Sequence, residues 1–560
     1  MLKVLGNIFA VFKAYDYRDK LLSALALVVL LLMVMKMILF PYGLFGFGGT
    51  EIYTEGIVAR NGIQNINPLF VDYNEADREV SHLVFSGLMK YDPVKKAVVD
   101  DMAVLTVDES KTQYLFVLRD GLKWSDGAAV TASDVFFTFN DIVLHPSFQN
   151  QLLKTNFEGV KIDLVDEKTI RFTLEKPNVF FINSLTTGIL PKHILDGVDP
   201  FDILQNDFNK KPVGTGPYMV TDPVEIFPDG RTQITLSKNP YSYQPLSKIE
   251  YMRFIAYPTM EELLDQINAV NGVVKVTGSY INEFQANERF KMIPYELPQY
   301  LAVFMNMDSK ILKDKGVRLA LQKSIDKDAL IGKAKDKIRV DTPLMDLKQE
   351  DLQYKPNVEQ ANGALKDAGY RYAEEDTDKV GIRYDEDGNA LELRLIARVY
   401  DETSPQYQET LDLVDFLQKA WEKIGFSIQV EFLPLAEFND RIMSRQYDLL
   451  LVGQNLGYNL DTYSYWHSAQ ATPLGQNFSN YKSFQVDSLI ETIRATFEAE
   501  KKEDKLKELA KSINDDIPAI FLYRPVYYYA SDGKVSGISM EGVVFPSDRF
   551  AGIAGWMFAE

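Results

Sequence analysis

The feature that most constrains this chain is an apolar run near its N-terminus. Residues 21–40 read LLSALALVVLLLMVMKMILF, with Lys36 as the only charge. A helix rises about 1.5 Å per residue, so this run spans roughly 30 Å, the thickness of the bilayer hydrocarbon core. A buried helix of a globular domain would normally show a polar face, and this run has none. The sequence therefore predicts one transmembrane helix over residues 21–42.

The residues around this run predict its orientation. Lys3, Lys13, Arg18 and Lys20 precede it, which favours a cytoplasmic segment over residues 1–20 and an extracytoplasmic main domain. The alternative is a cleaved secretory signal. The run is long for a signal, and no cleavage site of the A-x-A type follows it, so we expect an uncleaved anchor. The glycine-rich residues 43–50 are expected to link the anchor to the main domain.

Composition narrows the class of protein. The chain has no cysteine, which excludes disulfides, thiolate metal sites, cysteine nucleophiles and a lipid-bearing cysteine. The net charge is −19, and residues 1–40 carry +3, which leaves −22 for the rest. An acidic outer domain argues against binding of nucleic acid or of anionic lipid by that domain.

The sequence gives little sign of an active site. None of the four histidines stands at metal-ligand spacing, and there is no G-x-S-x-G elbow. The many acids leave a carboxylate-pair glycosidase open by composition, although nothing marks two of them. Residues 385–389 (DEDGN) are faintly similar to a calcium loop but lack its terminal Glu, so a turn between strands explains them better. We therefore predict a protein that is not an enzyme and needs no metal or cofactor.

The remainder of the chain alternates strand-like and helix-like stretches, which predicts an α/β architecture. Strands are expected at 51–59, 114–118, 161–163, 169–174, 300–306, 391–400, 427–433, 448–452 and 519–529. Helices are expected at 75–88, 131–144, 317–335, 357–368, 406–424 and 488–513. The pattern changes near Pro298, and the apolar stretch 519–529 is expected to be a buried strand that returns to the first part of the chain.

Several short motifs occur in a fixed order from about Gly56 onward. They are NINPL at 65–69, LVFSGL at 83–88, LRDGLKWSDG at 118–127, VTASDV at 130–135, LPKH at 190–193, GTGPY at 214–218, VR at 317–318, SIDK at 324–327, AGY at 368–370 and VDSLI at 486–490. Together they resemble the peptide-type extracytoplasmic solute-binding proteins of ABC importers, family 5. Most of these residues are of types that set turns and packing, such as glycine, proline and buried aromatics.

The resemblance implies an α/β, two-lobed fold like that of periplasmic binding proteins, with an extra subdomain in lobe one. Lobe one would take residues 51–297, lobe two residues 298–518, and residues 519–560 would return to lobe one. Ligand would be enclosed between lobes that close like a hinge. The chain would be a monomer that captures peptides and delivers them to an ABC transporter permease.

The resemblance also points to three stretches for the ligand site. The first, 72–76, contains Asn74 and Glu75, and the second is the crossing region with Phe304 and Asn306. The third is 453–461, followed by Trp466. Its predicted contacts are Gln454, Asn455, Tyr458 and Asp461.

Alternatives stay open for these residues and for the ligand. In similar peptide binders the third stretch often supplies a carboxylate for the ligand's amino group, and that position falls near Leu456 here. The ligand could then be an oligosaccharide or another polar solute. Asp461 and Glu75 could favour helix starts, and Trp466 could belong to the core. A membrane-anchored sensor or scaffold is a further alternative, but twenty N-terminal residues leave no room for a cytoplasmic signalling domain.

Overall fold

The computed structural model describes residues 51–559 except 333, 335, 345–346, 348–351, 374–380, 403 and 459. The predicted cytoplasmic segment, transmembrane helix and linker all lie outside the described residues. Within the described part of the chain, no helix combines the length and the apolar character that crossing a bilayer requires.

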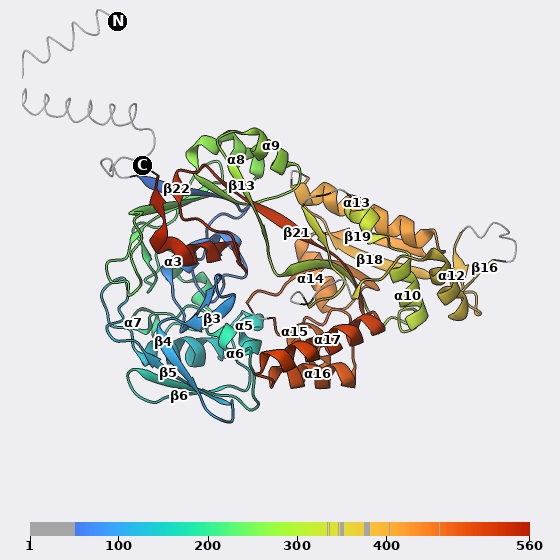
Figure 1. Ribbon diagram of the computed structural model, residues 1–560, viewed down its shortest axis with the longest axis horizontal. Helices are drawn as coiled ribbons and strands as arrows, with labels where there is room; N and C mark the ends of the chain where they lie inside the picture. Colours follow the sequence, from blue (N-terminus) through green and yellow to red (C-terminus); the bar gives the residue numbers. More distant parts are fainter. Residues whose placement is uncertain are drawn as a thin grey trace, which may run out of the picture. The chain divides into compact units, whose positions relative to one another are not determined.

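The architecture is mixed α/β and two-lobed, and one long strand is shared by the sheets of both lobes (Figure 1). The sheet of lobe one has β1 in its interior, parallel to β11 and β12, with β10 antiparallel to β11. Its strands are β1 (Ile52–Val58), β8 (Tyr218–Val220), β9 (Glu225–Ile226), β10 (Thr232–Lys238), β11 (Tyr251–Tyr257), β12 (Gly272–Val276) and β13 (Lys291–Glu296).

The sheet of lobe two is built around β18, which runs parallel to both of its neighbours, β19 and β20. Strand β14 is antiparallel to β20 and joins this group to the shared strand. The strands are β14 (Gln299–Met305), β15 (Lys337–Arg339), β18 (Glu392–Arg398), β19 (Ser427–Leu433) and β20 (Leu449–Asn455).

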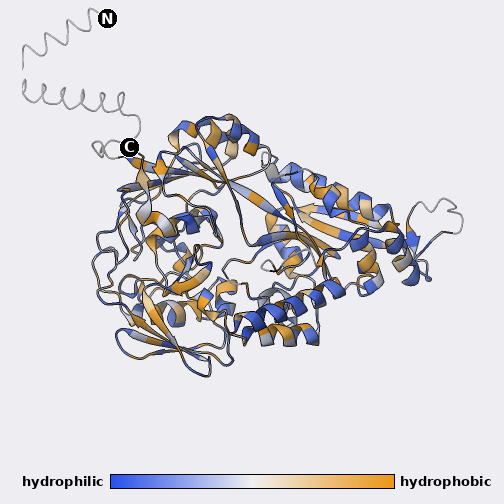
Figure 2. Cartoon of the chain, in the orientation of Figure 1, coloured by the Kyte–Doolittle hydropathy of each residue, from blue (hydrophilic) through white to orange (hydrophobic). Residues whose placement is uncertain are grey.

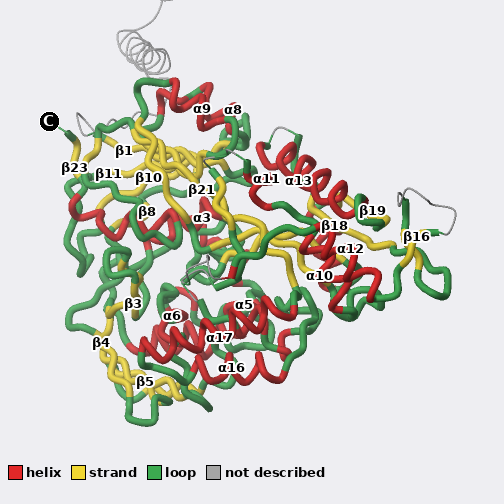
Figure 3. The backbone as a smooth tube through the Cα atoms, turned by 45° about the vertical axis from the view of Figure 1, so that its right-hand side comes forward, coloured by secondary structure: helices red, strands yellow, loops and turns green. Residues whose placement is uncertain are grey.

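The shared strand is β21 (Ala519–Ser531), and it is largely buried. Its first part pairs with β14 and β15 up to Pro525, and from Val526 it pairs with β13 and then β12. Figure 3 shows it crossing from one group of strands to the other. We use lobe one for residues 52–297 with 526–559, and lobe two for 298–525. The predicted buried strand at 519–529 is confirmed.

Helices and small sheets complete each lobe. Lobe one contains α3 (Glu75–Val84), α4 (Ala132–Phe136), the π-helix η1 (Phe137–Val143), α5 (Gln151–Asn156), α6 (Phe181–Ser184), α7 (Lys192–Leu195), α8 (Met260–Asp265), α9 (Tyr280–Ala286) and the 3₁₀ helices η2 (Ile203–Gln205), η3 (Asp207–Lys210), η4 (Ile267–Ala269) and η7 (Pro546–Gly555). Its small sheets are β2–β3 (Met89–Asp92, Ala97–Asp100), β4–β5–β7–β6 (Ala103–Val107, Gln113–Leu118, Thr169–Thr173, Lys161–Leu164) and β22–β23 (Val535–Ser536, Met557–Phe558).

The helices of lobe two cover its sheet with apolar faces. On α13, Leu413, Leu417 and Trp421 recur every four residues and are buried, because this spacing puts them on one side of a helix. Figure 2 shows the polar residues that α17 presents along its length. The helices are α10 (Lys315–Lys323), α11 (Lys327–Ile331), α12 (Val358–Asp367), α13 (Pro405–Glu422), α14 (Leu435–Met443), α15 (Tyr463–Trp466), η6 (Ser468–Gln470), α16 (Phe484–Arg494) and α17 (Ala499–Asp516). A short hairpin, β16–β17 (Arg371–Tyr372, Arg383–Tyr384), lies beside them.

Two predicted helices are each divided in two. The stretch 317–335 forms α10 and α11, because Asp326 leaves the helix and caps the second one through the N–H of Ala329. The stretch 488–513 forms α16 and α17, separated by residues 495–498. The predicted helix 75–88 ends at Val84, where Phe85 becomes extended.

Several residues singled out in the sequence determine where two backbone segments come close together or where the chain turns. A Cβ on Gly214 or Gly216 would lie about 2 Å from a carbonyl oxygen of α3, so only glycine fits there. Residues 385–389 form a turn in which the Asp385 carboxylate accepts from the N–H groups of Asp387 and Asn389. Arg318 of the motif VR makes its hydrogen bonds to the backbone. It is buried and donates to the carbonyl oxygens of Leu312, Lys313 and Asp516.

Candidate functional site

A cavity of about 520 Å³ has walls from both lobes. This volume is within the range of small-molecule sites in proteins. Lobe one contributes residues of α3, β2, α5, α6 and η7 and of the loops before and after α3, whereas lobe two contributes residues from the end of β20 to α15 together with Gln476. The lining combines aromatic rings with many uncharged polar side chains.

Helix α3 forms part of the lobe-one wall. Asn74 caps its start by accepting from the N–H of Ala76 at 3.0 Å. Arg78 and His82, one helical turn apart, line the cavity with Ser81, whereas Val80 and Val84 are fully buried in the core. The spacing of apolar and polar residues thus fixes which face of α3 reaches the cavity.

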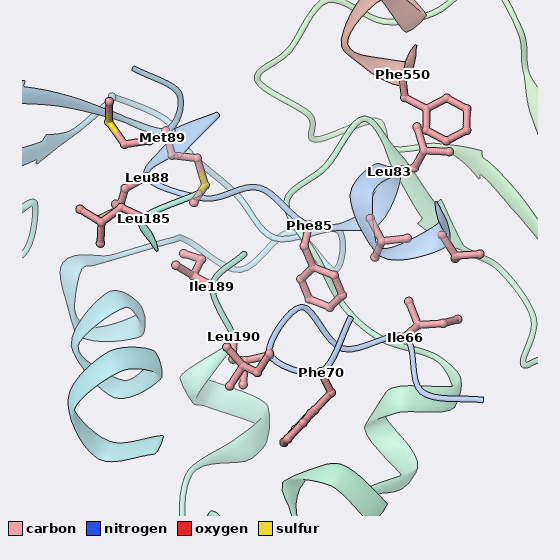
Figure 4. Packing of buried hydrophobic residues seen from close by; sticks show 14 of the residues in the cluster. Ile66, Phe70, Leu83, Phe85, Leu88, Met89, Leu185, Ile189, Leu190 and Phe550 are labelled. Carbon is pink, nitrogen blue, oxygen red and sulfur yellow. The ribbon is translucent and has the colours of Figure 1, made fainter. Parts of the chain in front are cut away.

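Apolar packing supports this wall from behind. Leu83, Phe85, Met89 and Phe550 line the cavity and also belong to the main hydrophobic cluster of lobe one. Figure 4 shows Met89 and Phe85 on the side of Leu185, Ile189 and Leu190, with Leu83 and Phe550 together on the other side. Because the same residues serve both core and cavity, the shape of the wall is set by the packing of the lobe.

The helix η7 brings residues from after β21 to the same wall. Its start is capped by Asp548, whose carboxylate accepts from the N–H groups of Val544 and Phe545 at 2.8 Å each. Ser547, Phe550 and Ala551 line the cavity. Burial raises the pKa of Asp548 to about 6, and the hydrogen bonds it accepts act in the opposite direction.

Lobe two reaches across the cavity with Tyr458. The loop that carries it turns at Gly457, whose φ of +57° lies in the left-handed region, and Asn455 accepts from the Gly457 N–H at 3.0 Å. The Tyr458 ring stacks on Tyr91 with centroids 5.0 Å apart and meets Phe545 edge to face at 4.9 Å. Its hydroxyl hydrogen-bonds to the Asp548 carboxylate. Tyr458 therefore connects the lobes.

The two acids of the cavity wall that lie in lobe one are paired with basic residues. Arg78 contacts Asp72 at 2.7 Å and lies over the ring of Phe545, and Lys90 contacts Asp101 at 3.3 Å. Burial raises the pKa of Asp101, and Lys90 opposes the shift.

The acid on the lobe-two side is paired as well. Asp461 is 6% exposed, contacts Arg494 at 3.1 Å and accepts from the N–H of Tyr463. Burial raises its pKa, and Arg494 lowers it. The acids of the wall are thus already compensated within the protein.

Of the residues predicted for the site, three line the cavity: Asn455, Tyr458 and Asp461. The other six lie outside its described lining. Asn74 caps α3 and donates to the carbonyl of Gly62, and Glu75 contacts Lys275 at 2.7 Å.

The remaining four lie in the interior of lobe two. Phe304 and Trp466 are 1% exposed and stack at 6.0 Å. Asn306 donates to the carbonyl of Tyr447, and Gln454 accepts from the hydroxyl of Tyr300. These polar groups hold neighbouring segments together.

The cavity also includes residues that the sequence did not indicate. The clearest are His82, Ser547 and the polar residues at the end of α6 and just after it, at 183–187. His82 and Ser547 are far apart in the sequence, and no spacing rule connects them. Across the described residues, no group of three or more His, Cys, Asp or Glu side chains is placed to hold a metal ion.

The fold is shared with solved solute-binding proteins. The Bacillus subtilis oligopeptide-binding protein AppA in complex with a nonapeptide superposes with a TM-score of 0.73, at 21% identity, over 91% of this chain and 100% of that chain. NikZ from Campylobacter jejuni in complex with Ni(L-His) gives 0.73 at 23% identity, over 90% and 99%. DppA from Helicobacter pylori with the peptide STSA gives 0.71 at 18% identity, over 91% and 98%.

Sequence comparison agrees with the fold. AppA of Bacillus subtilis is 24% identical over 484 residues, which cover 83% of this chain and 85% of AppA. Residues 97–476 match the family described as bacterial extracellular solute-binding proteins, family 5 Middle. The match covers more than half of the chain, and the two-lobed fold has a cavity lined by both lobes. The chain therefore belongs to the family 5 extracellular solute-binding proteins.

Proposed function

We propose that this chain is a membrane-anchored solute-binding protein that captures peptides between its lobes and delivers them to an ABC transporter permease. The observation that carries the proposal is the cavity with walls from both lobes, bridged by Tyr458. A ligand held by both walls favours the closed arrangement over an open one, which is how binding drives hinge closure.

Part of this function follows from family membership. The chain is a binding protein, not an enzyme, and it acts outside the cytoplasm. Its ligands are small solutes, and the family implies a permease as partner.

The choice of peptides rests on several observations. AppA and the Helicobacter pylori DppA hold a nonapeptide and the peptide STSA. The cavity offers amide and hydroxyl side chains that suit a peptide backbone, including Asn150, Asn183, Gln244 and Asn455. Its aromatic residues supply contact area with little loss of rotamer freedom.

We also propose the arrangement of the chain around this domain. Residues 1–20 would be cytoplasmic, residues 21–42 would cross the membrane, and residues 43–50 would link the anchor to the lobes. The expected division, with residues 51–297 and 519–560 in lobe one and 298–518 in lobe two, would place all of β21 in lobe one, whereas its pairing divides this strand after Pro525. The apolar run supports this anchor. The chain should fractionate with membranes, and a soluble mature form that begins near Thr50 would contradict the anchor.

Ligand identity is tested with the full chain purified in detergent. The protein is denatured, and released molecules are identified by mass spectrometry. In parallel, it is offered peptide, oligosaccharide and Ni(L-His) pools. We expect peptides to be released and to raise the melting temperature. If the protein retained only an oligosaccharide or only a metal complex, its ligand would belong to that class and not to the peptides.

The role of Tyr458 is tested by Tyr458→Ala, with Tyr458→Phe as the matched variant. Loss of the ring removes two aromatic contacts and one hydrogen bond across the cavity, so we expect ligand binding to weaken about tenfold or more. Tyr458→Phe removes only the hydrogen bond and should weaken binding less. The ligand-free melting temperature should change little, and an equal loss of stability and binding would mean that Tyr458 is a core residue.

A further inference from the structure

Ser547 is a buried residue of the cavity wall whose hydroxyl has no partner in the described structure. It is 1% exposed, and its Oγ makes no hydrogen bond with the described residues. Buried polar groups in proteins are nearly always hydrogen-bonded, and an unpaired one is destabilising. Its neighbours are engaged, since Asp548 caps η7 and Arg549 contacts Glu55 and Glu79. The Ser547 hydroxyl is thus left without a polar partner, whereas Arg549, whose Nε and Nη2 also make no hydrogen bond with the described residues, keeps two ion pairs.

The position of Ser547 on η7 places this residue at the wall of the cavity. Residues three apart lie above one another on a 3₁₀ helix, so Ser547 and Phe550 share one side of η7. Both line the cavity. Rotation about χ1 moves a serine Oγ among three staggered positions, so the hydroxyl can turn toward a bound molecule without movement of the backbone.

His82 lies next to Phe550 on the same wall. The two rings are 6.4 Å apart, and the ring nitrogens of His82 make no hydrogen bond with the described residues. Burial lowers the pKa of His82 to about 4, and Arg549, Arg78 and Lys90 lower it further. The imidazole is therefore neutral at pH 7 and offers one donor and one acceptor.

The acids of the cavity wall are engaged by cations of the protein, in the pairs Asp72–Arg78, Asp101–Lys90 and Asp461–Arg494. A charged end of a ligand would have to compete with these ion pairs. An uncharged donor or acceptor would instead meet Ser547 and His82, which have no competing partner among the described residues.

We propose that Ser547 and His82 form a subsite for an uncharged hydrogen-bonding segment of the ligand, such as a peptide amide, and not for a charged terminus. This inference rests on the proposed function, because it describes which part of a peptide the lobe-one wall recognises. It predicts that peptides bind through their interior and that blocking both ends is tolerated.

The first test uses Ser547→Ala and His82→Phe in the full chain. The second substitution keeps a ring against Phe550 and removes both nitrogens. The matched control is Ser237→Ala in β10, since Ser237 Oγ is also buried without a partner but does not belong to the described cavity lining. The probe is the best-retained peptide from pooled tetrapeptides and nonapeptides. We expect about three- to tenfold weaker binding for each site variant and unchanged binding for the control.

Stability separates a ligand contact from a structural role. Because no internal hydrogen bond is lost, Ser547→Ala should lower the ligand-free melting temperature no more than Ser237→Ala does. A change of less than twofold in the dissociation constants of both site variants would overturn the subsite.

The second test compares peptide pools with free ends and the same pools with acetylated N-termini and amidated C-termini. We expect both to be retained with dissociation constants within about threefold of each other. Retention of the free pool with loss of the blocked pool would overturn the subsite and leave peptide capture intact. Retention of neither pool would overturn peptide capture, and the subsite with it.

Discussion

Each lobe contains a buried cluster of three charged side chains, and the two clusters have opposite compositions. In lobe one, the cation Arg549 lies between two anions, at 3.2 Å from Glu55 and 2.5 Å from Glu79. In lobe two, the anion Asp341 lies between two cations, Lys327 and Arg339, each at 2.7 Å. The lobe-one cluster is fully buried, whereas the Arg339 side chain is 14% exposed.

The sign of the excess charge decides how each cluster responds to protons. Burial raises the pKa of Glu79 to about 7, with Arg549 opposing and Glu55 adding to the shift. Burial lowers the pKa of Lys327 to about 8, with Asp341 opposing. One cluster therefore favours taking up a proton on folding and the other favours releasing one.

The two shifts act on stability in separate pH windows. Folded Glu79 holds its proton above its ordinary pKa of 4.5, so its contribution to stability falls as pH rises from about 4.5 to 7. Folded Lys327 loses its proton below its ordinary pKa of 10.5, so its contribution rises as pH rises from about 8 to 10.5. Acid thus favours the cluster of lobe one, and base favours that of lobe two.

The largest effect is expected for Arg549→Met. This substitution leaves Glu55 and Glu79 buried without their shared cation, so we expect a loss of about 3–5 kcal/mol in the free energy of unfolding at pH 7. Urea denaturation measures the loss, and hydrogen exchange should rise in β1 and α3 but not in β18. A loss below about 1 kcal/mol would mean that the cluster does not need its cation.

A smaller effect is expected for Asp341→Asn in lobe two. Lys327 keeps a hydrogen bond to the Val340 carbonyl and can lose its proton, and Arg339 keeps contacts to Asp328 and the Tyr354 carbonyl. We therefore expect a loss of about 3 kcal/mol, with faster exchange in α11 and β15 only. If exchange also rose in α3, the two clusters would not be independent.

The smallest effect is expected for Glu79→Gln, which removes the surplus anion of lobe one. Between pH 7 and pH 5 the wild type should gain about 2 kcal/mol relative to the variant, because only the wild type takes up this proton. The titration of His82 is common to both proteins and cancels in the difference. Glu437→Gln on the exposed side of α14 is the control, and a pH-independent difference between wild type and Glu79→Gln would contradict the raised pKa.

Much of the secondary structure could be predicted from local patterns. Helix α13 has one apolar residue per turn on one face, and this pattern predicts a helix. Strand β21 is an apolar, aromatic run, which predicts a buried strand. Helices α10 and α11 were predicted as one because Asp326 could equally be a surface residue within a helix. The boundary depends on its cap, which is a three-dimensional contact.

The residues of the cavity were harder to predict than the secondary structure, because tertiary packing decides which side chains reach the cavity. Tyr458 could be found because a tyrosine between loop-forming residues has no core to enter, and it does line the cavity. Phe304 and Trp466 have the same residue types as ligand-stacking rings, yet they pack against each other in the interior. Ser547 and His82 line the same cavity only because η7 packs on α3, and no periodicity relates residues so distant in sequence.

Strand β21 also has a consequence for the order in which the protein folds. The sheets of both lobes include this strand, and the cation of the lobe-one cluster follows it at Arg549, so each lobe depends on residues beyond 518. Contacts that join β1 and Glu55 to Tyr529 and Arg549 close loops of several hundred residues, which makes their formation slow. During synthesis from the N-terminus, neither lobe can complete its core until this last part of the chain has emerged. Until then, apolar surface of both lobes and unpaired strand edges stay open to non-native contacts.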